Sequence, residues 1–375
     1  MSALDTLVDK DTIVICCGSG GVGKTTTAAV IAQEAARRGR DAVVVTIDPA
    51  KRLANALGLD ALSDSPSVVP RNLWDPDDTA PAGGRLSALM LDTKTTFDRL
   101  VTRYAVGDDQ AQRILDNSFY RNVSGALSGT QEYMAMEKLY ELHEDGGYEI
   151  IVVDTPPTRH ALDFLDAPDR LLRMLDNRVF RLLMMPTRAY LRVASVAVQT
   201  FLRTVSRVVG TEVVDDIVSF FRAFEGMEAG FRERAGRVRA LLADSGAAFV
   251  LVTSPRRDAI DEAAFFAQRL DDEHRSVAAL IVNRVHPAFG SELSEGLRLR
   301  AKELLEKSDS EAGGRLGALY DNLADFNEIA ARERGHLADL TARIGSATVA
   351  YVPFLAHDVH DLAALSEIGN AIFRE

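Results

Sequence analysis

Short apolar runs recur along the chain, and most are followed by stretches in which apolar positions have helical spacing. The runs cover 12–17, 41–47, 86–91, 149–153, 248–253, 277–282 and 347–352. Two of them, VVVTID and IIVVDT, show no apolar/polar alternation, which is typical of strands buried on both faces. The pattern predicts an α/β fold whose largely parallel sheet is flanked by helices.

Two stretches carry helical patterns without a strand signal. We expect 96–147 and 168–245 to pack together as an inserted α-helical subdomain, with the helical run of the second beginning at Pro168. The remaining segments, 1–95, 148–167 and 246–375, would form the core, and a chain of 375 residues is long enough for both parts. Residues 59–84 are rich in Pro, Asp and Gly and are predicted to form a surface excursion. Residues 287–344 predict two further helices separated by SDSEAGG.

A phosphate-binding motif lies between the first strand and the first helix of this pattern. Residues Gly18 to Thr25 read GSGGVGKT and satisfy GxxxxGK[ST] in the strand–loop–helix context that the motif requires. Glycines let successive N–H groups face an anion, and the helix N-terminus adds a favourable dipole. Lys24 would contact the β and γ phosphates of ATP, and the Thr25 hydroxyl would ligate Mg²⁺. The predicted ATP/ADP-binding residues of this loop are Gly20, Gly21, Val22, Gly23, Lys24, Thr25 and Thr26.

Two aspartates follow predicted strands at the edge where ligands bind in open α/β sheets. Asp48 directly follows the second run and Asp154 the fourth. A carboxylate at this edge can hold Mg²⁺ through water, or accept a hydrogen bond from the attacking water. Each could instead cap a helix. Their joint placement beside the loop favours Lys24, Asp48 and Asp154 as the catalytic group, with Thr25, Asp48 and Asp154 around the metal.

Several segments resemble the arsenical-pump ATPases and the Get-type ATPases that target tail-anchored membrane proteins. The resemblance rests on GSGGVGKTT, TIDPAKRL, DTPPTRHALDFLDAP and PFLAHDV, and it extends over nearly the whole chain. It implies a P-loop NTPase fold, with Asp48 as the switch I aspartate that positions water and Asp154 as the switch II aspartate near the metal. It also implies that Asn283 recognises adenine and that Pro353 and Phe354 lie in the loop covering the base. By its residue type alone, Asn283 could equally be a turn residue after a strand.

Ser19 departs from the pattern of these families, whose members carry a lysine there that reaches the phosphates of the other subunit. Three explanations remain open. The chain could be a slow ATPase that works as a nucleotide switch, or it could receive its lysine from a related partner chain. Alternatively, another residue such as Arg52 or Arg159 supplies the charge. A weakly hydrolysing regulatory subunit that pairs with a catalytic paralogue is therefore the alternative to an active ATPase.

Composition narrows the range of partners. A net charge of −12 and a pI near 5.2 argue against binding to nucleic acid. No apolar run approaches the roughly 20 residues of a membrane span, and no leader pattern begins the chain, so we expect a cytoplasmic protein, with peripheral membrane association as an option. The two cysteines, Cys16 and Cys17, are adjacent in one strand and provide neither a zinc site nor the thiolate cluster that arsenite needs.

The segment 177–211 contains no acidic residue and places its arginines and apolar residues on different arcs of a helix. From Arg188 onward, Arg192, Arg203 and Arg207 share one arc, and Phe201 lies among the apolar residues of the opposite arc. The apolar arc could be core. By resemblance to targeting ATPases it could be a groove for an apolar helix, and the arginines could instead face an anionic membrane.

The sequence as a whole predicts an ATP-hydrolysing switch that forms a homodimer, or a heterodimer with a paralogue, and handles a hydrophobic or membrane-protein client. A small-molecule kinase is a more distant alternative, without an acceptor-binding motif to support it.

Overall fold

The computed structural model describes most of the chain. The described residues are 3–10, 12–48, 52–76, 78–123, 130–145, 147–156, 163–177, 211–243, 247–290, 292–307, 311–345, 347–356, 359 and 362–374. Arg159 and the segment from Arg188 to Val209, with its predicted client face, lie outside them.

An eight-stranded sheet forms the centre of the described part, in the order β3-β4-β2-β5-β1-β6-β7-β8. The strands are β1 (Ile13–Cys17), β2 (Asp41–Thr46), β3 (Ser67–Val68), β4 (Arg85–Met90), β5 (Ile150–Asp154), β6 (Ala247–Thr253), β7 (Val277–Val285) and β8 (Thr348–Pro353). All pairings are parallel except that of β3 with β4. The seven predicted strands are confirmed, and the parallel arrangement brings their carboxyl ends to one edge.

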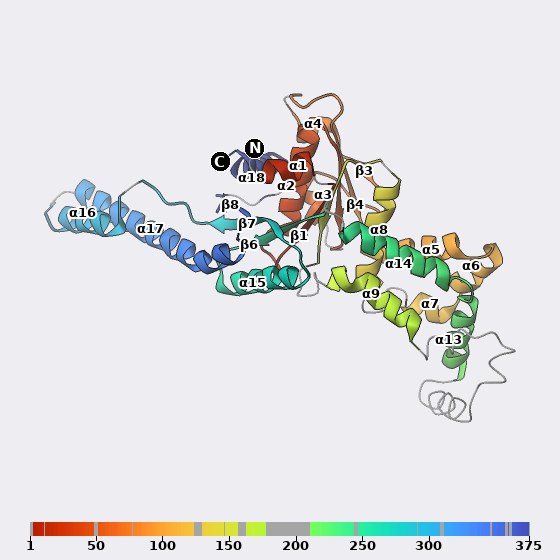
Figure 1. Ribbon diagram of the computed structural model, residues 1–375. Helices are drawn as coiled ribbons and strands as arrows, with labels where there is room; N and C mark the ends of the chain where they lie inside the picture. Colours follow the sequence, from red (N-terminus) through yellow and green to blue (C-terminus); the bar gives the residue numbers. More distant parts are fainter. Residues whose placement is uncertain are drawn as a thin grey trace.

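Helices cover both faces of the sheet and also extend beyond it (Figure 1). The bounds are α1 (Ala3–Asp9), α2 (Lys24–Arg37), α3 (Arg52–Ala56), α4 (Arg71–Trp74), α5 (Thr93–Tyr104), α6 (Asp108–Leu115), α7 (Ser118–Val123), α8 (Thr130–Glu144), α9 (Asp163–Asp176), α13 (Thr211–Ala223), α14 (Glu228–Ala243), α15 (Arg257–Asp272), α16 (Ser294–Lys307), α17 (Glu311–Arg343) and α18 (Leu362–Phe373). One apolar core joins the sheet to α1, α2 and α18, and a second joins the opposite face to α8, α14, α15 and the end of α17. The strands read as continuous apolar runs because both faces are covered.

The two cysteines show this two-sided burial within a single strand. Cys16 belongs to the first core and Cys17 to the second, and both thiols are free. Burial raises the pKa of Cys16 and raises that of Cys17 to about 12. Both groups therefore stay protonated near neutral pH and behave as small apolar side chains.

The predicted surface excursion at 59–84 was only partly right. The segment contains β3, which pairs antiparallel with β4, and α4, whose Trp74 is 1% exposed. The Trp74 indole donates a hydrogen bond to the Val69 carbonyl at 3.2 Å, and the Trp74 carbonyl accepts from Gln33 Nε2 on α2 at 3.1 Å. One large aromatic residue therefore ties this polar segment to α2.

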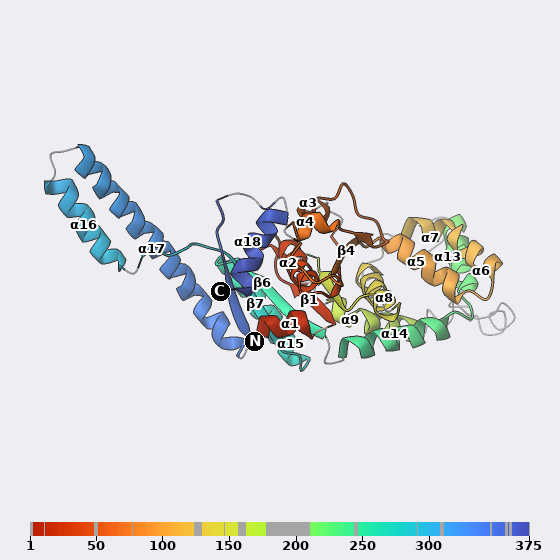
Figure 2. The ribbon, with the colours of Figure 1, turned by 90° about the horizontal axis from the view of Figure 1, so that it is seen from above.

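A group of helices with its own apolar core lies beyond one edge of the sheet, on the right of Figure 1, and Figure 2 shows the same arrangement from above. It comprises α5, α6, α7, α13 and parts of α8, α9 and α14, and its core includes Leu100, Tyr120, Phe224 and Phe231. Helix α9 begins at Asp163 and contains Pro168, so the helical run starts earlier than predicted.

Helices α16 and α17 form a hairpin that projects from the opposite side of the molecule in both views. They correspond to the two helices predicted within 287–344. Arg298 of α16 pairs with Asp321, Asp325 and Glu328 of α17 at 3.1, 2.7 and 3.0 Å, which aligns the two helices.

Candidate nucleotide site

The phosphate loop connects β1 to α2, and two of its glycines are required by their surroundings. Gly18 has φ +155°, and a Cβ there would lie 2.1 Å from the Val252 carbonyl oxygen on β6. Gly23 has φ +103°, and a Cβ there would lie 2.2 Å from Asn283 Nδ2 on β7. Left-handed φ values and these close approaches exclude a larger residue. Gly23 precedes α2 and makes no side-chain cap, so the first N–H groups of the helix remain available to an anion.

Lys24 is the first residue of α2 and is 6% exposed. Its Nζ donates a hydrogen bond to the Ser19 carbonyl at 2.8 Å, so the side chain folds back along the loop. Burial lowers the pKa of Lys24, while the negative charge of Asp154 acts in the opposite direction. The ammonium group is thus held beside the loop, where phosphates would replace part of its lost hydration.

Asp154 ends β5 and connects this strand to α2 and to β2. Its Oδ2 accepts hydrogen bonds from Thr25 Oγ1 at 2.7 Å and from Thr46 Oγ1 of β2 at 2.9 Å. The residue is 1% exposed, and its Oδ1 has no hydrogen-bond partner within the described part of the chain. Burial raises the pKa of Asp154, and the two hydroxyl donors oppose that shift. A buried carboxylate oxygen without a donor, next to the Thr25 hydroxyl, fits a hydrated Mg²⁺.

Asp48 follows β2 and is half-buried beside this carboxylate. Its backbone N–H donates to Thr46 Oγ1 at 3.2 Å, and the preceding Ile47 N–H donates to the Asp154 carbonyl at 3.2 Å. These contacts fix the end of β2 against the end of β5. Thr46 contacts both aspartate segments, a role that the sequence analysis did not assign because threonine is common in any strand.

One pocket of about 550 Å³ brings most of the predicted residues together. Its lining includes Gly21, Gly23, Lys24, Thr25, Thr26, Asp48, Asp154, Asn283, Pro353 and Phe354. Gly20 and Val22 line a second pocket of about 450 Å³, together with Ser19. Arg52 also lines the first pocket, and Arg284 lines both.

Asn283 is held against the phosphate loop in this structure. Its Nδ2 donates to the Val22 carbonyl at 2.8 Å, and its Oδ1 accepts from the Arg284 N–H at 2.9 Å. The residue lies within β7, which continues to Val285, rather than directly after a strand. Its predicted contact with adenine stays a prediction, and the structure adds a contact with the loop itself.

The sheet, the loop and the paired aspartate segments define a P-loop nucleotide-binding ATPase. Residues 11–309 match the model of the family described as Anion-transporting ATPase, and the chain belongs to this family. The predicted fold class and the ATPase activity are thereby confirmed.

Curated relatives carry a consistent name. The chain is 25% identical to "ATPase get3" of Pyrenophora tritici-repentis over 290 residues, 75% of this chain and 76% of the relative. It is 28% identical to "ATPase get3" of Aspergillus terreus over 176 residues, and 29% identical to "ATPase GET3" of Paracoccidioides lutzii over 175 residues. In these two matches the alignment covers 46% of this chain and 48% of the relative. The resemblance to Get-type ATPases is confirmed.

No described helix is long and apolar enough to cross a membrane. Within the same residues, no group of three or more His, Cys, Asp or Glu side chains is arranged to hold a metal ion.

Proposed function

We propose that the chain is an ATP-hydrolysing, dimeric switch that couples its nucleotide state to the handling of a hydrophobic or membrane-associated protein client. The observation that carries the proposal is the Asp154 carboxylate, which accepts from the phosphate loop through Thr25 and from β2 through Thr46. Gain or loss of the γ phosphate would therefore change the contacts of the segments that follow β2 and β5.

The hydrolytic roles follow from the positions of the side chains. The N–H groups at the start of α2 and Lys24 would bind the phosphates, and the Thr25 oxygen and Asp154, the latter through water, would hold the metal. When bound, Mg²⁺ neutralises charge that develops on the β and γ oxygens. Asp48 would accept a hydrogen bond from the water that attacks the γ phosphate. Asn283, Pro353 and Phe354 line the same pocket and would enclose the base.

The chain continues from Asp154 towards the helical region, which supports a mechanical link. Helix α9 packs on α8 and α14. Ion pairs connect α9 to its neighbours, from Asp166 to Arg269 of α15 at 3.5 Å and from Asp169 to Arg239 of α14 at 3.2 Å. Met174 near the end of α9 and Val213 near the start of α13 are 48% and 43% exposed. These apolar side chains flank the segment whose sequence predicts a client face.

The proposed dimer can be tested by measuring the molar mass of the purified chain with and without nucleotide. We expect the purified chain with Mg²⁺ and a non-hydrolysable ATP analogue to show about twice the mass of the nucleotide-free protein, because γ phosphates at the loop would bring two copies together. Light scattering after size exclusion measures this at several protein concentrations. A paralogue-dependent dimer would appear only when the two chains are mixed. A monomer under every condition would contradict the proposal.

Coupling to the helical region is tested by hydrogen exchange. We expect amide protection in α9, α13 and 178–210 to differ between the ADP and ATP-analogue states, and protection in β6 to stay the same, because β6 is central in the sheet. Exchange that is identical in both states throughout α9, α13 and residues 178–210 would argue against a nucleotide-controlled client surface.

A further inference from the structure

We propose that Arg284 is a second cation of the nucleotide site, after Lys24, that binds the phosphates. It would supply positive charge near Ser19, whose side chain is uncharged. This inference rests on the nucleotide binding proposed above. Arg284 follows Asn283 in β7, outside every motif that identified the loop, and the sequence analysis had considered Arg52 and Arg159 for this role.

The backbone at Arg284 is held in an unusual conformation. Its φ is +62°, in the left-handed region that non-glycine residues seldom adopt. The pairing of β7 with β8 is irregular between Val282 and Val285, and such bulges redirect side chains near active sites. Asn283 is anchored to the Val22 carbonyl on one side, and Val285 accepts from the Phe354 N–H at 2.9 Å on the other. Both neighbours therefore fix where the Arg284 side chain begins.

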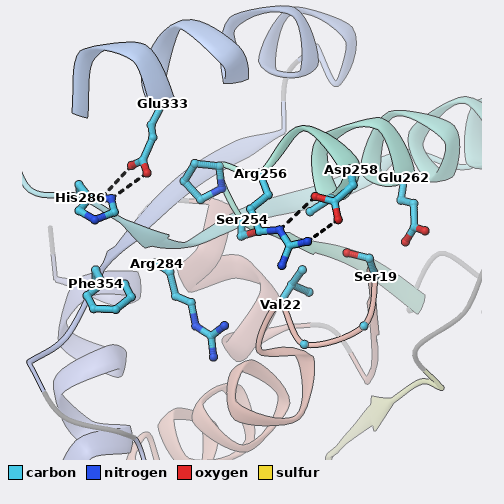
Figure 3. Close-up of a pocket in the computed structure, with 14 residues that line it drawn as sticks. Ser19, Val22, Ser254, Arg256, Asp258, Glu262, Arg284, His286, Glu333 and Phe354 are labelled. Carbon is cyan, nitrogen blue, oxygen red and sulfur yellow. Dashed lines mark hydrogen bonds and ion pairs between the residues drawn. The ribbon is translucent and has the colours of Figure 1, made fainter. Parts of the chain in front are cut away.

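The redirected side chain lies at the wall between two pockets. Gly21, Arg284 and Phe354 line both the nucleotide pocket and the pocket that contains Ser19. Figure 3 shows Arg284 extending between Phe354 and Val22, towards the phosphate loop. The guanidinium is exposed and has no ion pair or hydrogen bond to any residue that the structure describes. Among the residues that the structure describes, nothing competes with an anion held by the loop for this cation.

Two other described arginines that line these pockets, Arg256 and Arg52, are less suitable. Arg256 lines the pocket of Ser19, but Asp258 accepts from its Nη2 at 2.6 Å and from its Nε at 3.1 Å, which neutralises its charge (Figure 3). Arg52 lines the nucleotide pocket but not the pocket of Ser19. Of these three, Arg284 is the one that lines each pocket without a side-chain partner among the described residues.

A guanidinium that lines both pockets together with Gly21 of the phosphate loop would act on the polyphosphate. Lys24 is a point charge whose Nζ is oriented by the Ser19 carbonyl, and it can neutralise only part of a triphosphate. A planar, permanently charged guanidinium adds charge-assisted hydrogen bonds that become stronger as negative charge grows on the phosphates. Arg284 should therefore improve both the affinity for ATP and the rate of hydrolysis.

The test compares substitutions that separate charge from shape and from backbone strain. In titrations with ATP, we expect Arg284→Met to weaken binding about 10- to 100-fold and Arg284→Lys to fall between it and the wild type. Arg284→Gly should lose affinity as the Met variant does, yet melt at or above the wild-type temperature, because glycine relieves the left-handed strain. Arg256→Ala, which removes a paired arginine from the same pocket, should change affinity less than about twofold.

The outcomes distinguish this inference from the proposed function. If the wild type fails to bind ATP, the nucleotide site itself is refuted. If the wild type binds and Arg284→Met binds equally well, Arg284 has no such role. Equal losses in the Lys and Met variants would show that charge is not what matters. A turnover loss in Arg284→Met that Ser19→Lys reverses in the double variant would confirm that the two positions serve one charge requirement.

Discussion

Replacing Lys24 with alanine should nearly abolish ATP binding, with a loss in affinity of at least about 100-fold. The buried ammonium group is the main positive charge inside the phosphate loop, and hydrogen bonds to charged groups contribute about 1.5–3 kcal/mol each. Lys24 is already oriented by the Ser19 carbonyl at 2.8 Å, so little side-chain entropy is lost when phosphates bind. Equilibrium titration with a labelled ATP analogue measures the effect.

A matched control for this experiment is Lys302→Ala. Lys302 lies on α16 with a side chain that is 70% exposed, and its pairing with Glu306 spans 3.8 Å, so its removal should leave both ATP affinity and thermal stability unchanged. Unchanged ATP affinity in a folded Lys24→Ala protein would refute the assignment of the loop.

The sequence was most informative where one residue type satisfies a strict local requirement. Gly18 and Gly23 are read directly from the motif, and the structure shows the close approaches of β6 and β7 that require them. The continuous apolar runs likewise predicted the strands, because strands of a sheet covered on both faces are apolar at successive positions. The aspartates were found because parallel strands place their carboxyl ends at one edge.

The features that the sequence did not reveal depend on contacts between distant segments. Trp74 lies in a polar stretch, yet it is buried, and its carbonyl accepts a hydrogen bond from Gln33 on α2. The position of the Arg284 side chain depends on the irregular pairing of β7 with β8, which no local sequence pattern specifies. A guanidinium after a strand predicts nothing by itself. The role proposed for Arg284 comes from its place in the lining of both pockets.

Asp48→Asn should leave ATP binding almost intact while lowering turnover by about 10²- to 10⁴-fold, the range expected for loss of a group that takes up a proton in the transition state. The amide has the size of the carboxylate but is a weaker acceptor for the attacking water. Asp48 lines the nucleotide pocket beside Lys24 and Asp154, and its own N–H is fixed by Thr46 at 3.2 Å, so the substitution changes the chemistry more than the position.

The readout for Asp48 is single-turnover hydrolysis with saturating protein, beside the equilibrium affinity for the same nucleotide. Asp60→Asn provides the matched control, because this exposed aspartate lies outside both pockets and should behave as the wild type. Parallel losses of binding and turnover in Asp48→Asn would mean that the carboxylate organises the site or the metal rather than the water. A loss confined to turnover would place Asp48 next to the reacting water, because ground-state binding would then be unchanged while the transition state alone is destabilised.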